Sequence, residues 1–211
     1  MSSIFNELKN FGVIPVIVIN DPAKAAPLGK ALIDGGLPCA EITFRTANAA
    51  QAIREMAKAH PDMLVGAGTV LSPAQADAAV EAGSKFVISP GLNPEVVRHC
   101  QKKNIPILPG VVTPSEIELA LSLGLEAVKF FPAEAAGGTN MIKSLSGPYR
   151  NMRFVPTGGI SPKNLGEYLS IKSVIACGGS WMVKEDLIED GKFEEIKTLT
   201  REAVDLAKKF K

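Results

Sequence analysis

The chain has 211 residues, of which 23 are Lys or Arg and 22 are Asp or Glu, so its formal net charge at pH 7 is +1. Nucleic acids and anionic membranes bind basic surfaces, and this near-neutral chain gives no electrostatic argument for either partner. Because 46% of the residues are hydrophobic, a sizeable core can form, and we expect one globular domain over residues 1–211.

The N-terminal residues and the cysteines indicate the cellular compartment. Residues 1–11 have a helical pattern that includes Glu7 and Lys9, unlike the basic start and apolar run of a signal peptide. No apolar run reaches the roughly 18 residues that a membrane span needs. Widely spaced cysteines without a CxxC pattern predict reduced thiols at Cys39, Cys100 and Cys177. We therefore expect a cytoplasmic protein with an extra N-terminal helix.

Short apolar runs alternate with segments of helical periodicity along the chain. In chain order, the predicted strands are residues 13–19, 39–44, 64–70, 85–90, 105–111, 127–132, 153–157 and 173–178. The predicted helices are residues 22–35, 47–60, 73–82, 94–103, 114–123, 142–145, 162–170 and an amphipathic closing helix, 193–211. Eight strand–helix units favour an α/β fold of the closed (β/α)8 TIM barrel type. An open doubly wound sheet is the alternative, although no G-x-G-x-x-G motif follows the first strand.

Polar residues and glycines mark the predicted helix ends. N-cap residues followed by proline stand at Ser72-Pro73, Asn93-Pro94, Thr113-Pro114 and Ser161-Pro162. Left-handed C-caps are expected where helices stop at Gly35-Gly36, Gly83 and Gly124.

Lys129 is the one charged residue of the predicted strand 127–132. A buried ammonium loses its hydration and shifts toward the neutral amine, which attacks carbonyl groups to form Schiff bases. The alternative is a lysine at a strand edge or end whose ammonium reaches solvent along its alkyl stem.

Glu41, Thr43 and Arg45 alternate along the predicted second strand and so share one face. If that face points into a barrel, a carboxylate and a guanidinium replace the usual Val, Ile and Leu. A proton-transferring carboxylate beside a cation that binds a substrate carboxylate is one explanation. A structural Glu41–Arg45 ion pair is the other.

Glycines and hydroxyl residues gather where predicted strands end. Thr69 ends the third strand. One glycine pair, Gly158-Gly159, follows the seventh strand, and a second, Gly178-Gly179, lies at the end of the eighth. Loops after these two strands often bind phosphate in barrels through backbone N–H groups. Ser180 follows the second pair, and Trp181 is predicted to pack beneath that loop.

The two histidines, His60 and His99, lie far apart in predicted helices or at their ends and lack a metal-ligand spacing. We therefore expect no metal site and no metal-dependent aldolase or hydrolase.

Several segments together closely resemble the bacterial 2-keto-3-deoxy-6-phosphogluconate / 4-hydroxy-2-oxoglutarate aldolase family. They are Glu41-Ile42-Thr43-Phe44-Arg45-Thr46, Gly66-Ala67-Gly68-Thr69-Val70-Leu71, Ile88-Ser89-Pro90-Gly91, Lys129-Phe130-Phe131-Pro132-Ala133-Glu134, Pro156-Thr157-Gly158-Gly159-Ile160 and Gly178-Gly179-Ser180-Trp181. The resemblance runs from about Val13 to the final helix. It implies a class I aldolase on a (β/α)8 barrel, usually a homotrimer, that needs no metal or organic cofactor.

The resemblance also implies roles for individual residues. Lys129 would form the Schiff base, and Glu41 would be the general acid and base. The pyruvate portion would be held by Arg45 and Thr69 at its carboxylate and by Phe131 at its carbons. The remaining positions would contact the substrate hydroxyls (Thr157) and the phosphate (Gly158, Gly159, Gly179 and Ser180).

The implied substrate is 2-keto-3-deoxy-6-phosphogluconate, cleaved to pyruvate and glyceraldehyde 3-phosphate, with 4-hydroxy-2-oxoglutarate, cleaved to pyruvate and glyoxylate, as a second substrate. The galactonate epimer, a phosphate-binding barrel isomerase or synthase, and a catalytically silent sugar-phosphate-binding barrel are the alternatives. The chain departs from some relatives at the end of the first strand, where Val18-Ile19-Asn20 contains no arginine.

Overall fold

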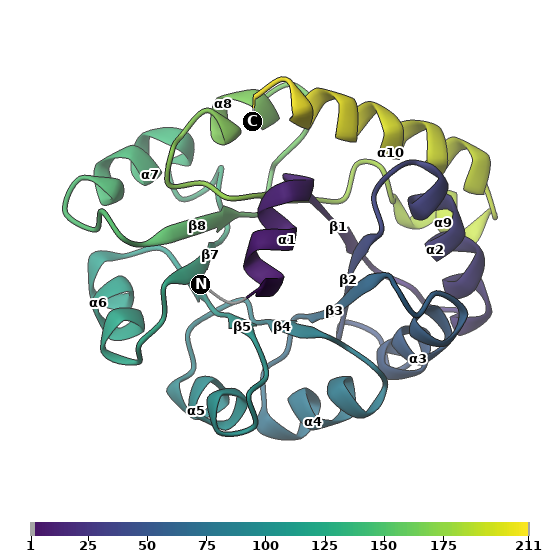
Figure 1. The fold of residues 1–211 in the computed structure, drawn as a ribbon, viewed down its shortest axis with the longest axis horizontal. Coiled ribbons are helices and arrows are strands. Elements are labelled where there is room, and N and C mark those ends of the chain that lie inside the picture. The colour runs from purple at the N-terminus through teal and green to yellow at the C-terminus, as the bar shows by residue number, and fades with distance from the viewer. Residues whose placement is uncertain (1–2, 211) are drawn as a thin grey trace.

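The computed structural model describes residues 3–210 and has an inner layer of parallel strands surrounded by helices (Figure 1). The strands are β1 (Val13–Ile17), β2 (Cys39–Thr43), β3 (Leu64–Gly68), β4 (Phe86–Ile88), β5 (Ile107–Leu108), β6 (Gly110–Val111), β7 (Ala127–Phe130), β8 (Arg153–Pro156) and β9 (Cys177–Gly179). The helices are α1 (Ser3–Phe11), η1 (Pro22–Lys24), α2 (Ala25–Asp34), α3 (Ala49–Ala59), α4 (Pro73–Glu81), α5 (Pro94–Lys102), α6 (Pro114–Ser122), α7 (Gly138–Ser146), α8 (Leu165–Leu169), α9 (Glu185–Glu189) and α10 (Phe193–Lys208). This order confirms the predicted α/β class and the predicted extra helix before the first strand.

The strands form two parallel sheets that curl around a common centre (Figure 1). One sheet has the order β5-β4-β3-β2-β1-β9, and the other has the order β6-β7-β8. Isolated bridges from Phe154 to Val174 and from Thr157 to Gly178 connect β8 with the segment that leads through β9. The predicted open doubly wound alternative fails, because the strand order follows the chain around the sheet with no reversal.

One predicted strand is interrupted at Pro109. The sequence predicts a continuous strand over residues 105–111, whereas the structure has β5 and β6 on either side of this proline. Proline has no backbone N–H to donate to a neighbouring strand, which explains the interruption. Its carbonyl still accepts a hydrogen bond from Lys129 N at 2.9 Å, so the segment continues to support β7.

Capping residues explain where the helices begin. Ser72, Asn93 and Thr113 are N-caps as predicted, and each side chain accepts a backbone N–H of the first turn. The prediction was wrong at Ser161, because Ser161 N donates to Asn164 Oδ1 at 2.8 Å in a turn, and α8 begins only at Leu165.

Glycines explain where helices end. Gly36, Gly83 and Gly124 have φ of +87°, +103° and +73°, the left-handed conformation that glycine adopts at little cost. Gly35 differs from the prediction, because it is right-handed with φ of −76° and continues the turn before Gly36.

Most of the core lies between the strands and the surrounding helices. Helix α10 buries Ile196 and Ala203 and packs beside α2, as its amphipathic pattern predicts, although Lys211 lies outside the described residues. All three cysteines are buried thiols that form no disulfide, and burial raises the pKa of Cys100 to about 11. None of the described helices combines the length and apolar character that crossing a membrane requires.

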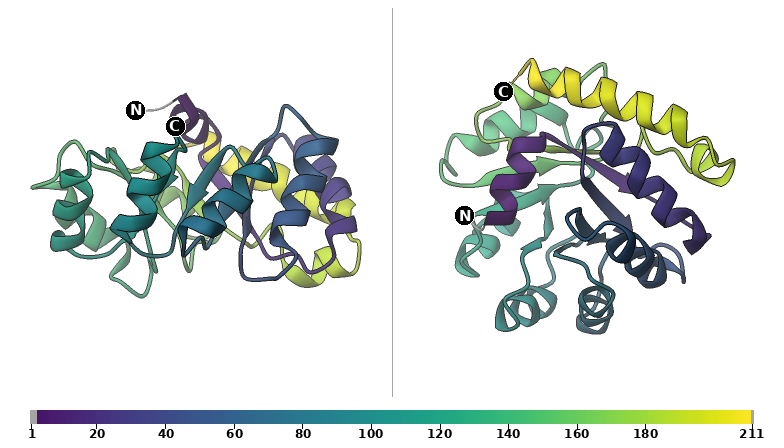
Figure 2. Two further views of the ribbon diagram at one scale, coloured as in Figure 1. Left: turned by 90° about the horizontal axis from the view of Figure 1, so that it is seen from below. Right: turned by 45° about the vertical axis from the view of Figure 1, so that its right-hand side comes forward.

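Helix α1 fixes which end of the sheet carries the site. It runs through Gly12 into the start of β1 and so lies across the amino ends of the strands, as the two further views in Figure 2 also show. The carboxyl ends therefore point to the opposite side, where α/β folds of this kind collect functional residues.

Candidate active site

Lys129 and Glu41 form a buried pair inside the curled sheet. Lys129 lies on β7 and Glu41 on β2, strands of the two different sheets, and Lys129 Nζ is 3.5 Å from Glu41 Oε1. Their side chains are only 5% and 1% exposed. Two alternative interpretations of the sequence are therefore wrong. Lys129 does not reach solvent, because it is enclosed, and the cation beside Glu41 is Lys129 rather than Arg45.

The surroundings of this pair include an aromatic ring and, in the part of the chain that the structure describes, leave one carboxylate oxygen without a hydrogen bond. The ring of Phe131 lies beneath Lys129 Nζ, 5.0 Å from its centroid, close enough for a cation–π contact. Within the described residues, Glu41 Oε1 is buried and has no hydrogen-bond partner. A buried carboxylate oxygen left without a hydrogen bond is unfavourable for stability, which is typical of a site kept for chemistry.

Two glycines of β3 make room for Glu41 and its neighbours. A Cβ at Gly68 would lie 2.2 Å from Glu41 Oε1, and a Cβ at Gly66 would lie 2.2 Å from the ring of Phe86. Both positions pair with β2 in register, Gly66 with Glu41 and Gly68 with Thr43. The Gly-Ala-Gly segment was noted in the sequence for its strand-end position, but its steric role was not predicted.

The other predicted residues of the second and third strands behave differently from one another. Thr43 is buried, and its Oγ1 donates to the Ile17 carbonyl at 2.9 Å, a structural contact to β1. Arg45 lies two residues past the end of β2, where it is exposed. Thr69 is half-buried directly after β3 and has φ of +57°, an unusual and strained conformation for a β-branched residue.

A cavity of ≈ 520 Å³ opens at the carboxyl ends of the strands. It brings together seven of the predicted substrate-binding residues: Arg45, Phe131, Thr157, Gly158, Gly159, Gly179 and Ser180. Thr69, Glu41 and Lys129 are not part of its lining. Phe131 links the two regions, since its ring lines the cavity and also contacts the Lys129 ammonium.

The cavity also contains residues that sequence reasoning missed. They are Val16, Val18, Ile160, Val183, Lys184, Glu185 and Asp186. The available signal for the last three was that they follow shortly after the Gly-Gly-Ser segment, which had been predicted to form a ligand-binding loop.

The loop after β8 is fixed by the segment after β7. Ala133 N donates to the Thr157 carbonyl at 2.8 Å, and Glu134 N donates to the Gly158 carbonyl at 3.1 Å. Gly158 and Gly159 have φ of +103° and +79°, and a Cβ at Gly159 would lie 2.5 Å from Glu134 Cγ. Only glycine therefore fits these positions without strain.

Glu134 is held in turn by Tyr168, whose hydroxyl donates to its carboxylate. Burial and this hydrogen bond to Glu134 raise the pKa of Tyr168. The Tyr168–Glu134 contact thus supports the side of the cavity that Gly159 forms.

The loop after β9 is packed as predicted. A Cβ at Gly179 would lie 1.8 Å from the ring of Trp181, and one at Gly178 would lie 2.4 Å from Thr157 Oγ1. Trp181 is half-buried and packs against both hydrophobic clusters of the core, which confirms the packing role predicted for it. Close packing here brings the backbone of both glycine loops to one cavity.

The histidines lie away from this cavity. His60 Nε2 is 2.7 Å from the Ala26 carbonyl, and His99 Nε2 is 2.8 Å from Asp77 Oδ1. Hydrogen bonds from Lys103 and His99 hold the pKa of Asp77 below its usual value. Among the described residues, no three His, Cys, Asp or Glu side chains gather as metal ligands would.

Residues 4–199 match the family model of KDPG and KHG aldolases. KDPG stands for 2-keto-3-deoxy-6-phosphogluconate and KHG for 2-keto-4-hydroxyglutarate. The chain belongs to this aldolase family. It is 47% identical over 205 residues to 2-dehydro-3-deoxy-phosphogluconate aldolase of Haemophilus influenzae, and the matched region covers 97% of each chain. It is also 47% identical over 196 residues to the KHG/KDPG aldolase of Escherichia coli, and that match covers 93% of this chain and 92% of the other. The resemblance seen in the sequence is confirmed.

A solved member of the family has nearly the same fold. The KDPG aldolase of Legionella pneumophila, in which pyruvate was captured at low pH as a covalent carbinolamine intermediate, superposes with a TM-score of 0.93. The two chains are 42% identical, and the match covers 96% of this chain and 98% of that one.

Proposed function

We propose that this protein is a class I aldolase that cleaves 2-keto-3-deoxy-6-phosphogluconate to pyruvate and glyceraldehyde 3-phosphate through a Schiff base at Lys129. The observation that carries the proposal is the buried Lys129–Glu41 pair, 3.5 Å apart, beside the cavity at the strand ends. Membership of the aldolase family and the carbinolamine of the Legionella relative support the same chemistry. An isomerase, a synthase or a silent barrel would have no use for a lysine enclosed in this way.

The reaction begins with a neutral amine. Glu41 accepts the proton of the Lys129 ammonium, and the lone pair of Nζ attacks the C2 carbonyl carbon of the substrate to form a carbinolamine. Glu41 returns its proton to the departing hydroxyl, so that loss of water gives an iminium ion and restores the Glu41 carboxylate. The positive nitrogen of the iminium attracts electrons from the neighbouring C3–C4 bond.

Cleavage needs a base and an electron acceptor. Glu41, through one water, takes the proton of the C4 hydroxyl, the C3–C4 bond breaks, and its electron pair moves into an enamine on Lys129 while the aldehyde departs. Protonation of the enamine at C3 restores an iminium, and hydrolysis releases pyruvate and Lys129. General acid–base catalysis of this kind typically contributes about 10²–10⁴-fold.

The remaining side chains hold the pyruvate portion and the hydroxyls. Arg45 and Thr69 bind the carboxylate, and Phe131 packs against the pyruvyl carbons. Thr157 contacts the hydroxyls that distinguish the gluconate from the galactonate epimer. The position of Arg45, Phe131 and Thr157 on one cavity supports this division.

The phosphate lies between the two glycine loops. Backbone N–H groups of Gly158, Gly159 and Gly179 and the hydroxyl of Ser180 bind it, and close packing of these loops supports the assignment. The smaller 4-hydroxy-2-oxoglutarate, which has no phosphate, is a second substrate that uses only the pyruvate side. Comparison of kcat/KM for the gluconate-derived, galactonate-derived and small substrates tests this order of preference.

We further propose a single domain over residues 1–211 in which the two sheets close into one (β/α)8 barrel, working as a cytoplasmic homotrimer. The bridges between β8 and the β9 segment support closure, and three buried thiols without a disulfide support a reducing compartment. Light scattering of the purified protein tests the trimer.

Borohydride trapping tests the proposed chemistry. The protein incubated with pyruvate and borohydride should gain the mass of one reduced pyruvyl group on the peptide that contains Lys129. The Lys129→Ala variant should gain none, whereas Lys143→Ala, which removes an exposed lysine of α7, should be labelled like the wild type. An unmodified Lys129 in the wild type would refute the mechanism.

A further inference from the structure

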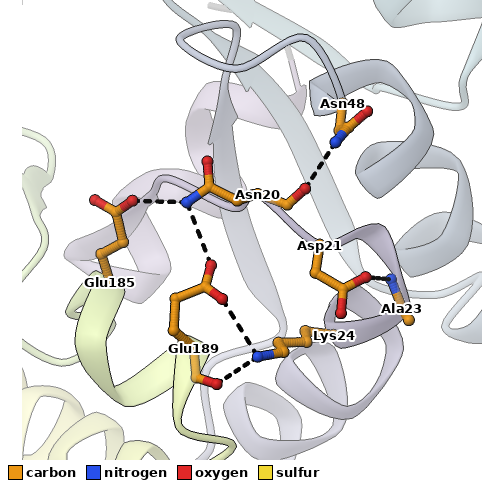
Figure 3. Close-up of polar contacts among 7 residues, drawn as sticks. All are labelled: Asn20, Asp21, Ala23, Lys24, Asn48, Glu185 and Glu189. Carbon is orange, nitrogen blue, oxygen red and sulfur yellow. Dashed lines mark hydrogen bonds and ion pairs between the residues drawn. The ribbon is translucent and has the colours of Figure 1, made fainter.

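The end of the first strand, where the sequence lacks the arginine of some relatives, is connected to α9. Asn20 follows β1, and its Nδ2 donates to Glu185 Oε1 at 2.8 Å and to Glu189 Oε1 at 3.3 Å (Figure 3). Glu185 and Glu189 are four residues apart and so lie on one face of this short helix. One amide group therefore binds two carboxylates from a segment 165 residues further along the chain.

The same region is fixed by further contacts. Lys24 Nζ donates to the Glu189 carbonyl and lies 3.3 Å from its carboxylate Oε2. The Asn20 carbonyl accepts a hydrogen bond from Asn48 Nδ2 at 2.7 Å, which connects it to the start of α3 (Figure 3). Asn20 is thus held by its backbone while its side chain holds α9.

Charge explains why this contact matters for the cavity. Lys184, Glu185 and Asp186 line it at the edge beside Ser180. A substrate phosphate bound near Ser180 would be repelled by the exposed Glu185 carboxylate if the two came within about one Debye length, roughly 8–10 Å. Asn20, which is not part of the cavity lining, draws this carboxylate toward β1 (Figure 3).

We propose that Asn20 is a positioning residue for recognition of the phosphorylated substrate. Its side-chain amide holds the Glu185 carboxylate away from the phosphate and leaves the Lys184 ammonium to face the anion. Asn20 touches no reacting atom and acts through Glu185. The proposal rests on the proposed function for the identity of the anion.

The kinetic test compares a substrate with and without a phosphate. Asn20→Ala should raise KM for 2-keto-3-deoxy-6-phosphogluconate about three- to tenfold, since a side-chain hydrogen bond to a charged group is lost. Asn20→Asp should raise it further, because a third carboxylate then faces Glu185 and Glu189. For both variants, kcat and the KM for 4-hydroxy-2-oxoglutarate should stay within about twofold of the wild type.

A double variant separates charge from mere packing. Asn20→Ala/Glu185→Gln should return KM for the phosphorylated substrate toward the wild-type value, because the displaced side chain no longer carries a charge. The control Asn48→Ala removes a hydrogen bond of the same region but leaves the bonds from Asn20 to α9 intact, and it should change KM little. Equal losses on both substrates, or no recovery in the double variant, would overturn the proposal.

Binding of inorganic phosphate to the same variants, measured by calorimetry, needs no turnover. It should weaken in Asn20→Ala and recover in the double variant, and unchanged affinity in Asn20→Ala would also overturn the proposal. If the wild type cleaves neither substrate, the proposed function fails, whereas this binding series still decides the role of Asn20.

Discussion

The two halves of the candidate site are built in different ways. Lys129 and Glu41 lie on strands in the interior, and their side chains are almost fully buried. The phosphate side is made of loops and a short helix after β8 and β9, where Ser180 and Lys184 are exposed. The proposed function thus assigns bond cleavage to a buried region and phosphate recognition to an exposed one.

The largest effect is expected from Lys129→Ala. Loss of the amine removes the covalent intermediate for every substrate, so kcat should fall by about 10⁴-fold or more on phosphorylated and unphosphorylated keto acids alike. A coupled assay of pyruvate release with lactate dehydrogenase measures this. Full activity in the variant would contradict the role of the buried region.

Glu41→Gln keeps the shape of the side chain but removes its ability to take a proton. We expect kcat to fall by about 10²–10³-fold on both substrates, because proton transfer to and from C4 and C3 is lost. Steady-state kinetics with the two substrates measures the fall. A loss confined to the phosphorylated substrate would move Glu41 from the chemistry to recognition.

Two glycine substitutions compare the halves directly. Gly68→Ala places a Cβ 2.2 Å from Glu41 Oε1, and the displaced carboxylate should lower kcat by about 10²-fold on both substrates. Gly179→Ala places a Cβ 1.8 Å from the Trp181 ring and should instead raise KM for the phosphorylated substrate about tenfold.

Gly91→Ala is the matched control for both glycine variants, because nothing lies within 4 Å of a Cβ there. Kinetics should be read together with thermal melting, which reports any general loss of folding. If Gly68→Ala and Gly179→Ala give the same pattern on the two substrates, the division between the halves is wrong.

The smallest effect is expected from Tyr168→Phe, which removes the hydroxyl that donates to Glu134 behind Gly159. Stability to urea should fall by about 1 kcal/mol, because a partly buried hydrogen bond to a charged group is lost. KM for the phosphorylated substrate should rise about two- to threefold with kcat unchanged.

Tyr149→Phe serves as its control, since Tyr149 bonds to Glu118 on a helix away from the cavity. It should leave both KM values unchanged. An equal rise of KM in the two variants would mean that the contact with Glu134 has no particular role at the cavity.

Much of the fold could be predicted because local signals were strong. The Ser72, Asn93 and Thr113 caps and the alternating apolar runs are short-range features, and the structure contains them where the sequence indicates. The break at Pro109 was missed although proline, which donates no backbone hydrogen bond, is visible in the sequence. The turn after Ser161 was missed because it depends on a hydrogen bond to Asn164 that the pattern does not reveal.

The candidate site was predicted unevenly for a related reason. Lys129 and Glu41 stand out because charged residues in apolar strands are rare, and the sequence could therefore indicate them. Asn20 and Gly68 do not stand out, because their importance arises only when segments far apart in the chain meet, as Asn20 meets α9. A single sequence carries no record of such contacts.

The central claim is that Lys129 of the buried pair forms the covalent bond to pyruvate. A crystal structure of the protein treated with pyruvate and borohydride tests it most directly. We predict continuous electron density from Lys129 Nζ to the C2 atom of the pyruvyl group, with Glu41 beside it and the carboxylate toward Arg45. Density on another lysine, or pyruvate bound without a covalent link, would contradict the account.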